Sequence, residues 1–222
     1  MKFRYHSFRH AEAIFNEPEF TEQLVEILQI VNSITEDELI TRHESYGAKD
    51  IEKTPKSLSV ALNSIFKERF TAAEWHQESK IFQDSNYKGE TWRLDFAKKD
   101  VSIEVAFNHS TVIAWNLIKP VLASELNHVE KAIQTKLGVI ITATEALKKH
   151  GGFDPAIGTY EKFLEHLPPL NNLLTVPLFI IGLDAPDTFH VKKHQHAPRK
   201  KIGKIIMKEM LLKDATEDDI EI

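Results

Sequence analysis

The chain begins with two stretches in which apolar residues recur every three or four positions. This spacing places apolar side chains on one face of a helix, and it predicts amphipathic helices over residues 17–33 and 57–74. The stretches 41–56 and 79–90 are mostly polar and are predicted to be loops. The N-terminal part of the chain is therefore predicted to supply helices that each bury one face.

Apolar and β-branched residues mark the strands that follow. The stretch from Trp92 to Phe107 predicts two strands joined at Lys98-Lys99-Asp100. The runs Leu137–Thr142 and Val176–Gly182 are short and apolar throughout, which is typical of fully buried strands in a central sheet.

Two further helical patterns separate these strands. The first, 112–134, contains Pro120, which is expected to kink or divide the helix, and the second is the short stretch Tyr160–Leu167. The order is two helices, two strands, a helix, a strand, a helix, a strand and a C-terminal tail. It predicts an α/β fold with a central mixed sheet flanked by helices, and 222 residues fit a single domain over 1–222.

Composition excludes several classes of protein. The absence of cysteine rules out disulfides, a thiolate nucleophile and a cysteine-ligated metal. No apolar run approaches the roughly 18–20 residues of a membrane-spanning helix, and the first residues lack the apolar core of a secretion signal. We therefore expect a cytoplasmic protein without a membrane partner.

The net charge of −5, taken alone, argues against a nucleic-acid partner, but the charge is unevenly spread. Residues 12–52 hold 11 acidic and two basic residues, a net −9, whereas residues 187–208 hold seven basic and one acidic residue, a net +6. Local fields attract a polyanion, whatever the total charge. The basic C-terminal segment 187–208 is therefore a candidate for phosphate contacts, and the alternative is a solvated basic segment.

Two carboxylates in the predicted hairpin are the candidate chemistry. Glu104 lies mid-strand on the face opposite the apolar residues, and Asp95 lies on the same face of the first strand if the two strands pair. Adjacent carboxylates repel unless they are protonated or bridged by a cation, and an all-oxygen pair favours Mg²⁺. The alternative is a hairpin whose polar face meets water.

Asp95 followed, after eight residues, by Glu104-Val-X-Phe resembles the catalytic motif of restriction endonucleases of the PD-(D/E)XK superfamily. The similarity is to the BglII and BstYI enzymes and, more distantly, to BamHI. Segments 60–68, 103–107 and 176–186 resemble BstYI in the same order, so the resemblance spans most of the chain. It implies a restriction-endonuclease-like core.

The resemblance also implies an active site. Asp95 and Glu104 would be the metal ligands, and the main-chain carbonyl of Val105 would be a third ligand of a Mg²⁺ cofactor. Glu78, in a segment that resembles the end of a BamHI helix, would be an outer active-site carboxylate. The implied reaction is in-line attack of a metal-activated water on a DNA phosphodiester, leaving a 5′-phosphate and a 3′-hydroxyl.

One position departs from the superfamily pattern. The usual lysine two residues after the second acid is Ala106, which can neither orient a water nor accept its proton. Three explanations stay open. Glu78 or a lysine from another segment (Lys98, Lys99 or Lys119) does that work; the proton goes to bulk solvent or a DNA phosphate; or Ala106 is an introduced inactivating substitution.

The resemblance further implies residues that contact DNA. Asn108 and His109 follow the metal strand, where related enzymes place polar groups against bases; the alternative is a strand-to-helix turn capped by Asn108 or Ser110. Within the basic segment, the candidate phosphate contacts are Lys192, Lys193, Arg199, Lys200 and Lys201.

The leading hypothesis is a type II restriction endonuclease that acts as a homodimer on double-stranded DNA at a short palindrome, with GATC as a guess for its centre. It would need Mg²⁺ and no nucleotide cofactor. The alternatives are a catalytically weak DNA-binding relative, a PD-(D/E)XK nuclease of repair or recombination, and a protein-interaction domain whose carboxylate pair has no catalytic role.

Overall fold

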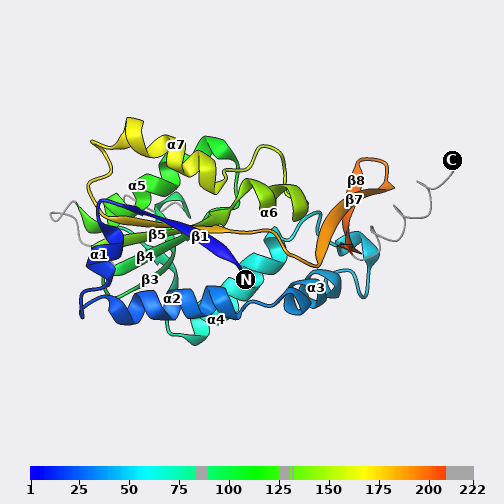
Figure 1. Ribbon diagram of the computed structural model, residues 1–222, viewed down its shortest axis with the longest axis horizontal. Coiled ribbons are helices and arrows are strands. Elements are labelled where there is room, and N and C mark those ends of the chain that lie inside the picture. Colours follow the sequence, from blue (N-terminus) through cyan, green and yellow to red (C-terminus); the bar gives the residue numbers. More distant parts are fainter. Residues whose placement is uncertain (84–89, 126–130, 132, 209–222) are drawn as a thin grey trace, which may run out of the picture.

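A six-stranded mixed sheet forms the centre of the protein, seen in a computed structural model that describes residues 1–83, 90–125, 131 and 133–208 (Figure 1). The strand order is β1-β6-β5-β4-β3-β2. The strands are β1 (Phe3–Phe8), β2 (His76–Lys80), β3 (Arg93–Lys98), β4 (Val101–Val105), β5 (Leu137–Ala143) and β6 (Leu178–Leu183). Strands β4, β5 and β6 run parallel, and β1 and the β2–β3 pair add antiparallel edges.

Helices cover both faces of this sheet, as the sequence predicted (Figure 1). They are α1 (Ala11–Phe15), α2 (Thr21–Ser33), α3 (Glu36–Ser45), α4 (Ser59–Ala72), α5 (Ile113–Ser124), α6 (Glu145–His150) and α7 (Tyr160–Leu170). Buried residues of α1, α2 and α4 pack on one face, and those of α5 and α7 pack on the other. No helix in the described part of the chain is long and apolar enough to cross a membrane.

The helices at 17–33 and 57–74 are confirmed as α2 and α4, but the polar stretch 41–56 is not wholly a loop. Helix α3 extends into it as far as Ser45. Two of its side chains, Leu39 and His43, are buried, and the Thr35 hydroxyl accepts a hydrogen bond from the Glu38 amide at its N-terminus. Two buried positions in ten residues are too weak a pattern to distinguish from a loop.

The helix expected at 112–134 is shorter than predicted. Helix α5 runs through Pro120 without being divided and ends at Ser124. Residues 126–130 and 132 of the predicted range lie outside the described residues.

The two edge strands were not predicted, for a common physical reason. An edge strand pairs on one side only and stays partly solvated, so it needs no continuous apolar run. Strand β2 has the sequence His-Gln-Glu-Ser-Lys and buries only Ser79, and β1 buries none of its residues fully. Their place in the sheet comes from backbone pairing with β3 and β6.

The basic C-terminal segment is a β-hairpin of its own and not an irregular tail. Strands β7 (Phe189–Ala197) and β8 (Lys200–Met207) form a two-stranded sheet at one end of the molecule (Figure 1). Gly203 docks it: its amide donates to the Pro55 carbonyl at 2.9 Å, and its carbonyl accepts from His43 Nε2 at 3.0 Å. A Cβ at Gly203 would lie 2.8 Å from the Pro55 carbonyl oxygen, so this close approach requires glycine.

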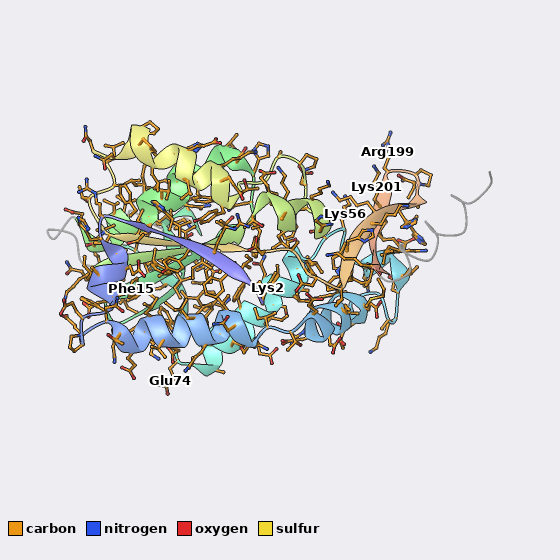
Figure 2. The ribbon with its side chains drawn as sticks, in the orientation of Figure 1. Lys2, Phe15, Lys56, Glu74, Arg199 and Lys201 are labelled. Carbon is orange, nitrogen blue, oxygen red and sulfur yellow. The ribbon has the colours of Figure 1, made fainter. Side chains whose placement is uncertain are left out.

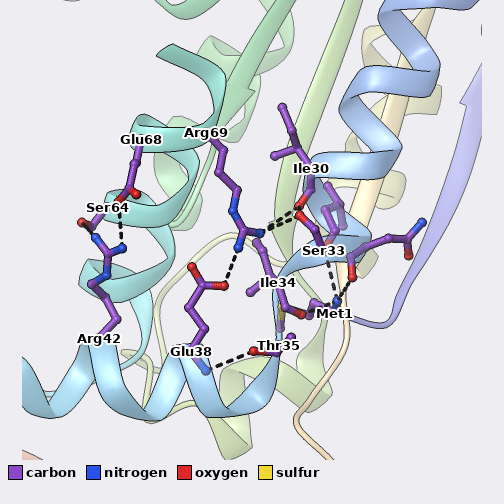
Figure 3. A network of polar contacts seen from close by, with 12 residues as sticks. Met1, Ile30, Ser33, Ile34, Thr35, Glu38, Arg42, Ser64, Glu68 and Arg69 are labelled. Carbon is purple, nitrogen blue, oxygen red and sulfur yellow. Dashed lines mark hydrogen bonds and ion pairs between the residues drawn. The ribbon is translucent and has the colours of Figure 1, made fainter. Parts of the chain in front are cut away.

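A polar network joins α2, α3 and α4 (Figure 3). Arg69 of α4 donates to the Glu38 carboxylate at 2.5 Å and to the Ser33 hydroxyl at 2.8 Å. Arg42 of α3 donates to Ser64 at 3.0 Å and to Glu68 at 2.7 Å. These half-buried contacts fix how α4 is rotated, and that rotation decides which side chains of α4 face the site described next.

Candidate active site

Three strands present carboxylates at one edge of the sheet. Because β2 and β4 are both antiparallel to β3, the C-terminal ends of β2 and β4 lie beside the start of β3. A pocket of about 260 Å³ opens at this edge, between the strands and α4. Its lining residues are Asn63, Phe66, Lys67, Gln77, Glu78, Asp95, Phe96 and Val105.

Strand register brings the two predicted metal ligands together. Phe96 pairs with Ile103, so Asp95 falls beside Glu104 on the adjacent strand. Asp95 Oδ2 accepts a hydrogen bond from the Val105 amide at 2.7 Å, which holds the carboxylate at the end of β4. Asp95 and Glu104 therefore lie side by side, as the hairpin predicted, next to Val105 at the end of β4; that these residues hold a metal stays a prediction.

Glu104 is deeply buried, which overturns the alternative of a polar hairpin face in water. The residue is 2% exposed, and Ser102 on the same face is fully buried. Glu104 Oε2 accepts a hydrogen bond from Lys119 Nζ at 2.5 Å. Glu104 Oε1 is buried and has no hydrogen-bond partner among the described residues. A buried carboxylate oxygen without a partner is costly, so it indicates a missing cation or proton.

Lys119 reaches Glu104 because α5 lies unusually close to the sheet. A Cβ on Gly138 of β5 would lie 2.6 Å from the Pro120 Cβ, so only glycine permits this approach. Ala106 is 2% exposed and packs in the same cluster as Leu117 of α5. Small residues at Gly138 and Ala106 therefore let α5 lie close enough to the sheet for Lys119 to contact Glu104.

Lys98 and Lys99, the other two lysines that could act in place of the usual lysine at position 106, form contacts away from the carboxylates. Lys98 donates to both carboxylate oxygens of Glu26, at 3.0 and 3.1 Å, and to the Ala73 carbonyl. Lys99 donates to Glu22 at 2.9 Å. Both contacts hold the β3–β4 hairpin to α2. Of the three candidates, the structure brings only Lys119 to the carboxylates.

Glu78 lies on β2, and the described register places it opposite Asp95, between the pairs Gln77–Phe96 and Ser79–Leu94. Its backbone has φ of 51°, a left-handed conformation that costs a non-glycine residue about 1 kcal/mol or more. Its side chain is exposed and lines the pocket. A strained residue at this point indicates that the direction of its side chain matters.

The electrostatics of the site follow from this crowding. Burial, followed by the Asp95 charge, raises the pKa of the Glu104 carboxyl from 4.5 to about 8, although the Lys119 ammonium acts in the opposite direction. Burial also raises the pKa of Asp95, and the Glu78 charge adds to that effect. The Val105 amide and Lys119 oppose it.

The donor set suits a hard divalent cation. Asp95 and Glu104 offer carboxylate oxygens, and the orphaned Glu104 Oε1 is the atom that such an ion would satisfy. Across residues 1–83, 90–125, 131 and 133–208, no three His, Cys, Asp or Glu side chains gather as a metal cluster. A third protein ligand would therefore come from the backbone, for which the resemblance implies the Val105 carbonyl, with Glu78 outside the ligand set.

Comparisons with known proteins show the family and the fold of this chain. The sequence model of the family "Restriction endonuclease BglII/BglIII" matches residues 3–183. The chain belongs to this family. Two crystal structures of BglII show the same fold, and each comparison covers 93% of this chain and 100% of BglII. The complex with a DNA 16-mer has 18% identity and a TM-score of 0.63, and free BglII has 20% identity and a TM-score of 0.53. A comparison with curated proteins found no match.

The basic hairpin lies beyond the residues that the family model matches. Figure 2 shows Arg199 and Lys201 on this hairpin, away from the body of the protein. Lys192 lies directly opposite Lys204 in the register, and both are exposed. Like charges facing each other across strands destabilise a hairpin, so the arrangement favours an anionic partner.

The basic residues predicted to contact phosphates differ in whether they already have a partner in the protein. The Lys193 ammonium donates to the Phe153 carbonyl at 2.9 Å, and Lys200 pairs with Glu52 at 2.8 Å. No described residue forms an ion pair with Lys192, Arg199 or Lys201.

Asn108 and His109 lie in the turn after β4, exposed in both cases. His109 Nδ1 accepts from the Thr111 amide at 3.2 Å and caps the turn that leads into α5, a role expected for Asn108 or Ser110. Asn108 Oδ1 accepts from Asn116 of α5 at 3.1 Å. Both residues thus make contacts within the protein, and their exposure to solvent is compatible with contacts to DNA bases.

Two residues of the pocket were not singled out as functional by the sequence. Asn63 and Lys67 of α4 line it opposite the carboxylates. Their spacing of four residues indicated a shared polar face of the helix. Nothing in the sequence indicated that this face meets β2 and β3.

The burial of Glu104 predicts an unusual pH dependence of stability. Its pKa is raised in the folded protein, so between about pH 4.5 and 8 the folded state keeps a proton that the unfolded state releases. The free energy of unfolding of the metal-free protein should therefore fall as pH rises through this window, by up to about 1.4 kcal/mol per pH unit from this group. Glu104→Gln should remove that slope in urea unfolding measured with a chelator.

The matched control is Glu165→Gln, because Glu165 is exposed on α7. This variant should keep the wild-type slope. Parallel pH profiles for wild type and Glu104→Gln would show that Glu104 is not buried in this way.

Proposed function

We propose that this protein is a type II restriction endonuclease that hydrolyses both strands of DNA at a short palindrome, with a divalent metal ion as cofactor. The observation that carries the proposal is the orphaned oxygen of buried Glu104 beside Asp95, in a pocket at the sheet edge. Membership of the BglII/BglIII family supports the same activity. The short palindrome, with GATC as a candidate centre, follows from the resemblance to BglII and BstYI.

Asp95, Glu104 and the carbonyl of Val105 would hold the ion, and their all-oxygen chemistry favours Mg²⁺. When bound, Mg²⁺ acidifies a water molecule and stabilises charge that develops on a phosphoryl group. The Val105 amide holds the Asp95 carboxylate in place through the 2.7 Å hydrogen bond. Burial of Glu104 excludes bulk water from one side of the ion, which strengthens the electrostatic interactions there.

Lys119 takes the part of the lysine that Ala106 replaces. Its side chain is 12% exposed and its ammonium lies 2.5 Å from Glu104, so it supplies positive charge beside the reacting phosphate from α5 and not from β4. Glu78, exposed on the open side of the pocket, orients a water molecule or a second ion. This division of roles argues against the hypothesis of an inactive DNA-binding relative, because the positive charge that Ala106 cannot provide is present from another element.

DNA would lie along the edge that holds the pocket and the loops after β4. Asn108 and His109 would meet bases, and the hairpin would contact phosphates through Lys192, Lys193, Arg199, Lys200 and Lys201. A homodimer would present two pockets to the two strands of a palindrome. The crystal structure of BglII complexed with a DNA 16-mer supports double-stranded DNA as the partner.

The direct test is digestion of phage DNA with Mg²⁺, followed by sequencing of the cut ends. We expect discrete fragments, one short palindrome at every end and 5′-phosphates. A smear, or cutting of branched DNA alone, would support a repair or recombination nuclease. Binding without cutting would support a weak relative, and no DNA affinity at low salt would contradict all three.

Replacing either metal ligand should separate cutting from binding. We expect Asp95→Asn and Glu104→Gln to lower the cleavage rate by at least about 100-fold, because each removes a carboxylate ligand of the ion. DNA binding measured by gel shift should largely survive. Wild-type cutting by either variant would refute the assignment of the site.

Lys119→Met should lower the single-turnover cleavage rate by at least about 100-fold, because it removes the ammonium beside Glu104. The matched control is Lys98→Met, which removes a half-buried lysine–carboxylate contact, with Glu26, at the far end of the β3–β4 hairpin. The control should keep cutting below its unfolding temperature. Equal losses in the two variants would indicate a general effect on stability and would contradict the role given to Lys119.

The hairpin should contribute a salt-dependent part of DNA affinity. A triple variant with glutamine at Lys192, Arg199 and Lys201 should bind more weakly, and the slope of log affinity against log salt should fall by about one for each phosphate that the hairpin no longer neutralises. A second triple variant with glutamine at Lys99, Lys136 and Lys162 removes equal charge elsewhere and should keep the slope. Identical slopes for both triple variants would exclude the hairpin from the interface.

A further inference from the structure

We propose that Lys67, assisted by Asn63, binds a phosphate of the DNA strand being cut, from the α4 wall of the carboxylate pocket. The inference rests on the proposed endonuclease function and adds two substrate-binding residues to it. The two walls of the pocket differ in charge: the strands carry the Glu78 and Asp95 carboxylates, and α4 carries the Lys67 ammonium.

The two residues form a continuous polar wall. Asn63 and Lys67 are four residues apart on α4, so their side chains leave the same face of the helix, one turn from each other. Both are exposed, and both line the pocket whose opposite wall holds Glu78 and Asp95. Lys67 also lines a second hollow that runs along α4 from Ser64 to Ala72. The α4 wall of the pocket thus carries one ammonium and one amide.

The Lys67 charge is free to meet a ligand. The adjacent carboxylate of Glu68 is already held by Arg42 at 2.7 Å, and Arg42 also contacts Ser64 (Figure 3). Glu78 and Asp95 share the pocket with Lys67 but lie beyond ion-pair distance of it, and no other described residue pairs with its ammonium.

A phosphodiester is the ligand that suits these walls. The carboxylates of Glu78, Asp95 and Glu104 repel an approaching phosphate, and a bound divalent ion offsets that repulsion only on the sheet side. An ammonium binds phosphate as a point charge, and an asparagine amide can donate a hydrogen bond to a phosphate oxygen. Lys67 and Asn63 therefore supply attraction from the side that the ion does not reach. Their contact would be with the cut strand, because the same pocket holds the reacting groups.

The test compares Lys67→Met and Lys67→Arg with the control Lys99→Met. Lys99 carries the same charge but lies at the opposite end of the β3–β4 hairpin, in contact with Glu22. We expect Lys67→Met to lower single-turnover kcat/KM at least about 10-fold and the salt slope of metal-free binding by about one. Lys67→Arg should restore both, and Lys99→Met should change neither. Asn63→Ala should give a smaller loss than Lys67→Met.

Substrates with a neutral methylphosphonate at single positions identify the phosphate. At the phosphate that Lys67 contacts, in the cut strand at or next to the cleaved bond, Lys67→Met should no longer differ from wild type. A penalty that persists at every position, or a Lys67→Met variant equal to Lys99→Met in cleavage and salt slope, would overturn the inference. If wild type gives no fragments, the proposed function fails, and the binding arm still decides whether Lys67 contacts a phosphate.

Discussion

The contact between Glu104 and Lys119 lies under α5 with almost no access to water, and the close approach of α5 to the sheet makes it possible. Taking a carboxylate and an ammonium out of water costs several kcal/mol per ion unless the remaining lone pairs are satisfied. Here one oxygen of Glu104 stays unpaired. The contact forms because Gly138 and Ala106 let α5 approach the sheet, and a divalent cation at the unpaired oxygen would offset part of this cost. A charged Glu104 is thus destabilised at the position where the proposed chemistry would need charge.

Ion pairs also shape the distribution of charge over the protein surface. Many acidic residues of the 12–52 stretch are paired with cations from distant segments: Glu19 with Lys136, Glu22 with Lys99, Glu26 with Lys98, Glu38 with Arg69 and Glu52 with Lys200. The exposed pairs among them add little stability, but all five place a cation beside a carboxylate of the acidic stretch. The cations left without a described partner include Lys67 in the pocket and several on the hairpin. A chain of net charge −5 can therefore still present positive potential where DNA would bind.

The polar contacts drawn in Figure 3 join α4 to α2 and α3. Arg42 and Arg69 hold α4 against α2 and α3, and the Gly203 contact with Pro55 ties the hairpin to the segment that leads into α4. One helix thus carries the polar wall of the pocket and, through its N-terminal connection, the docking point of the basic hairpin. The placement of both depends on the rotation and position of α4.

The sequence by itself determined the elements with strong periodicity and which two carboxylates lie side by side on the sheet. Buried strands and one-sided helices leave a pattern because water exclusion acts on every second or every third to fourth residue. It could not determine β1, β2 or the β7–β8 hairpin, because edge strands and ribbons are held by backbone pairing and carry little apolar pattern. It left three lysines as equal candidates at the site. Only the tertiary structure chose Lys119, because the choice depends on how closely α5 approaches Gly138, a contact between residues far apart in the chain. The same reason applies to Lys67, whose helix face was readable from sequence and whose neighbours were not.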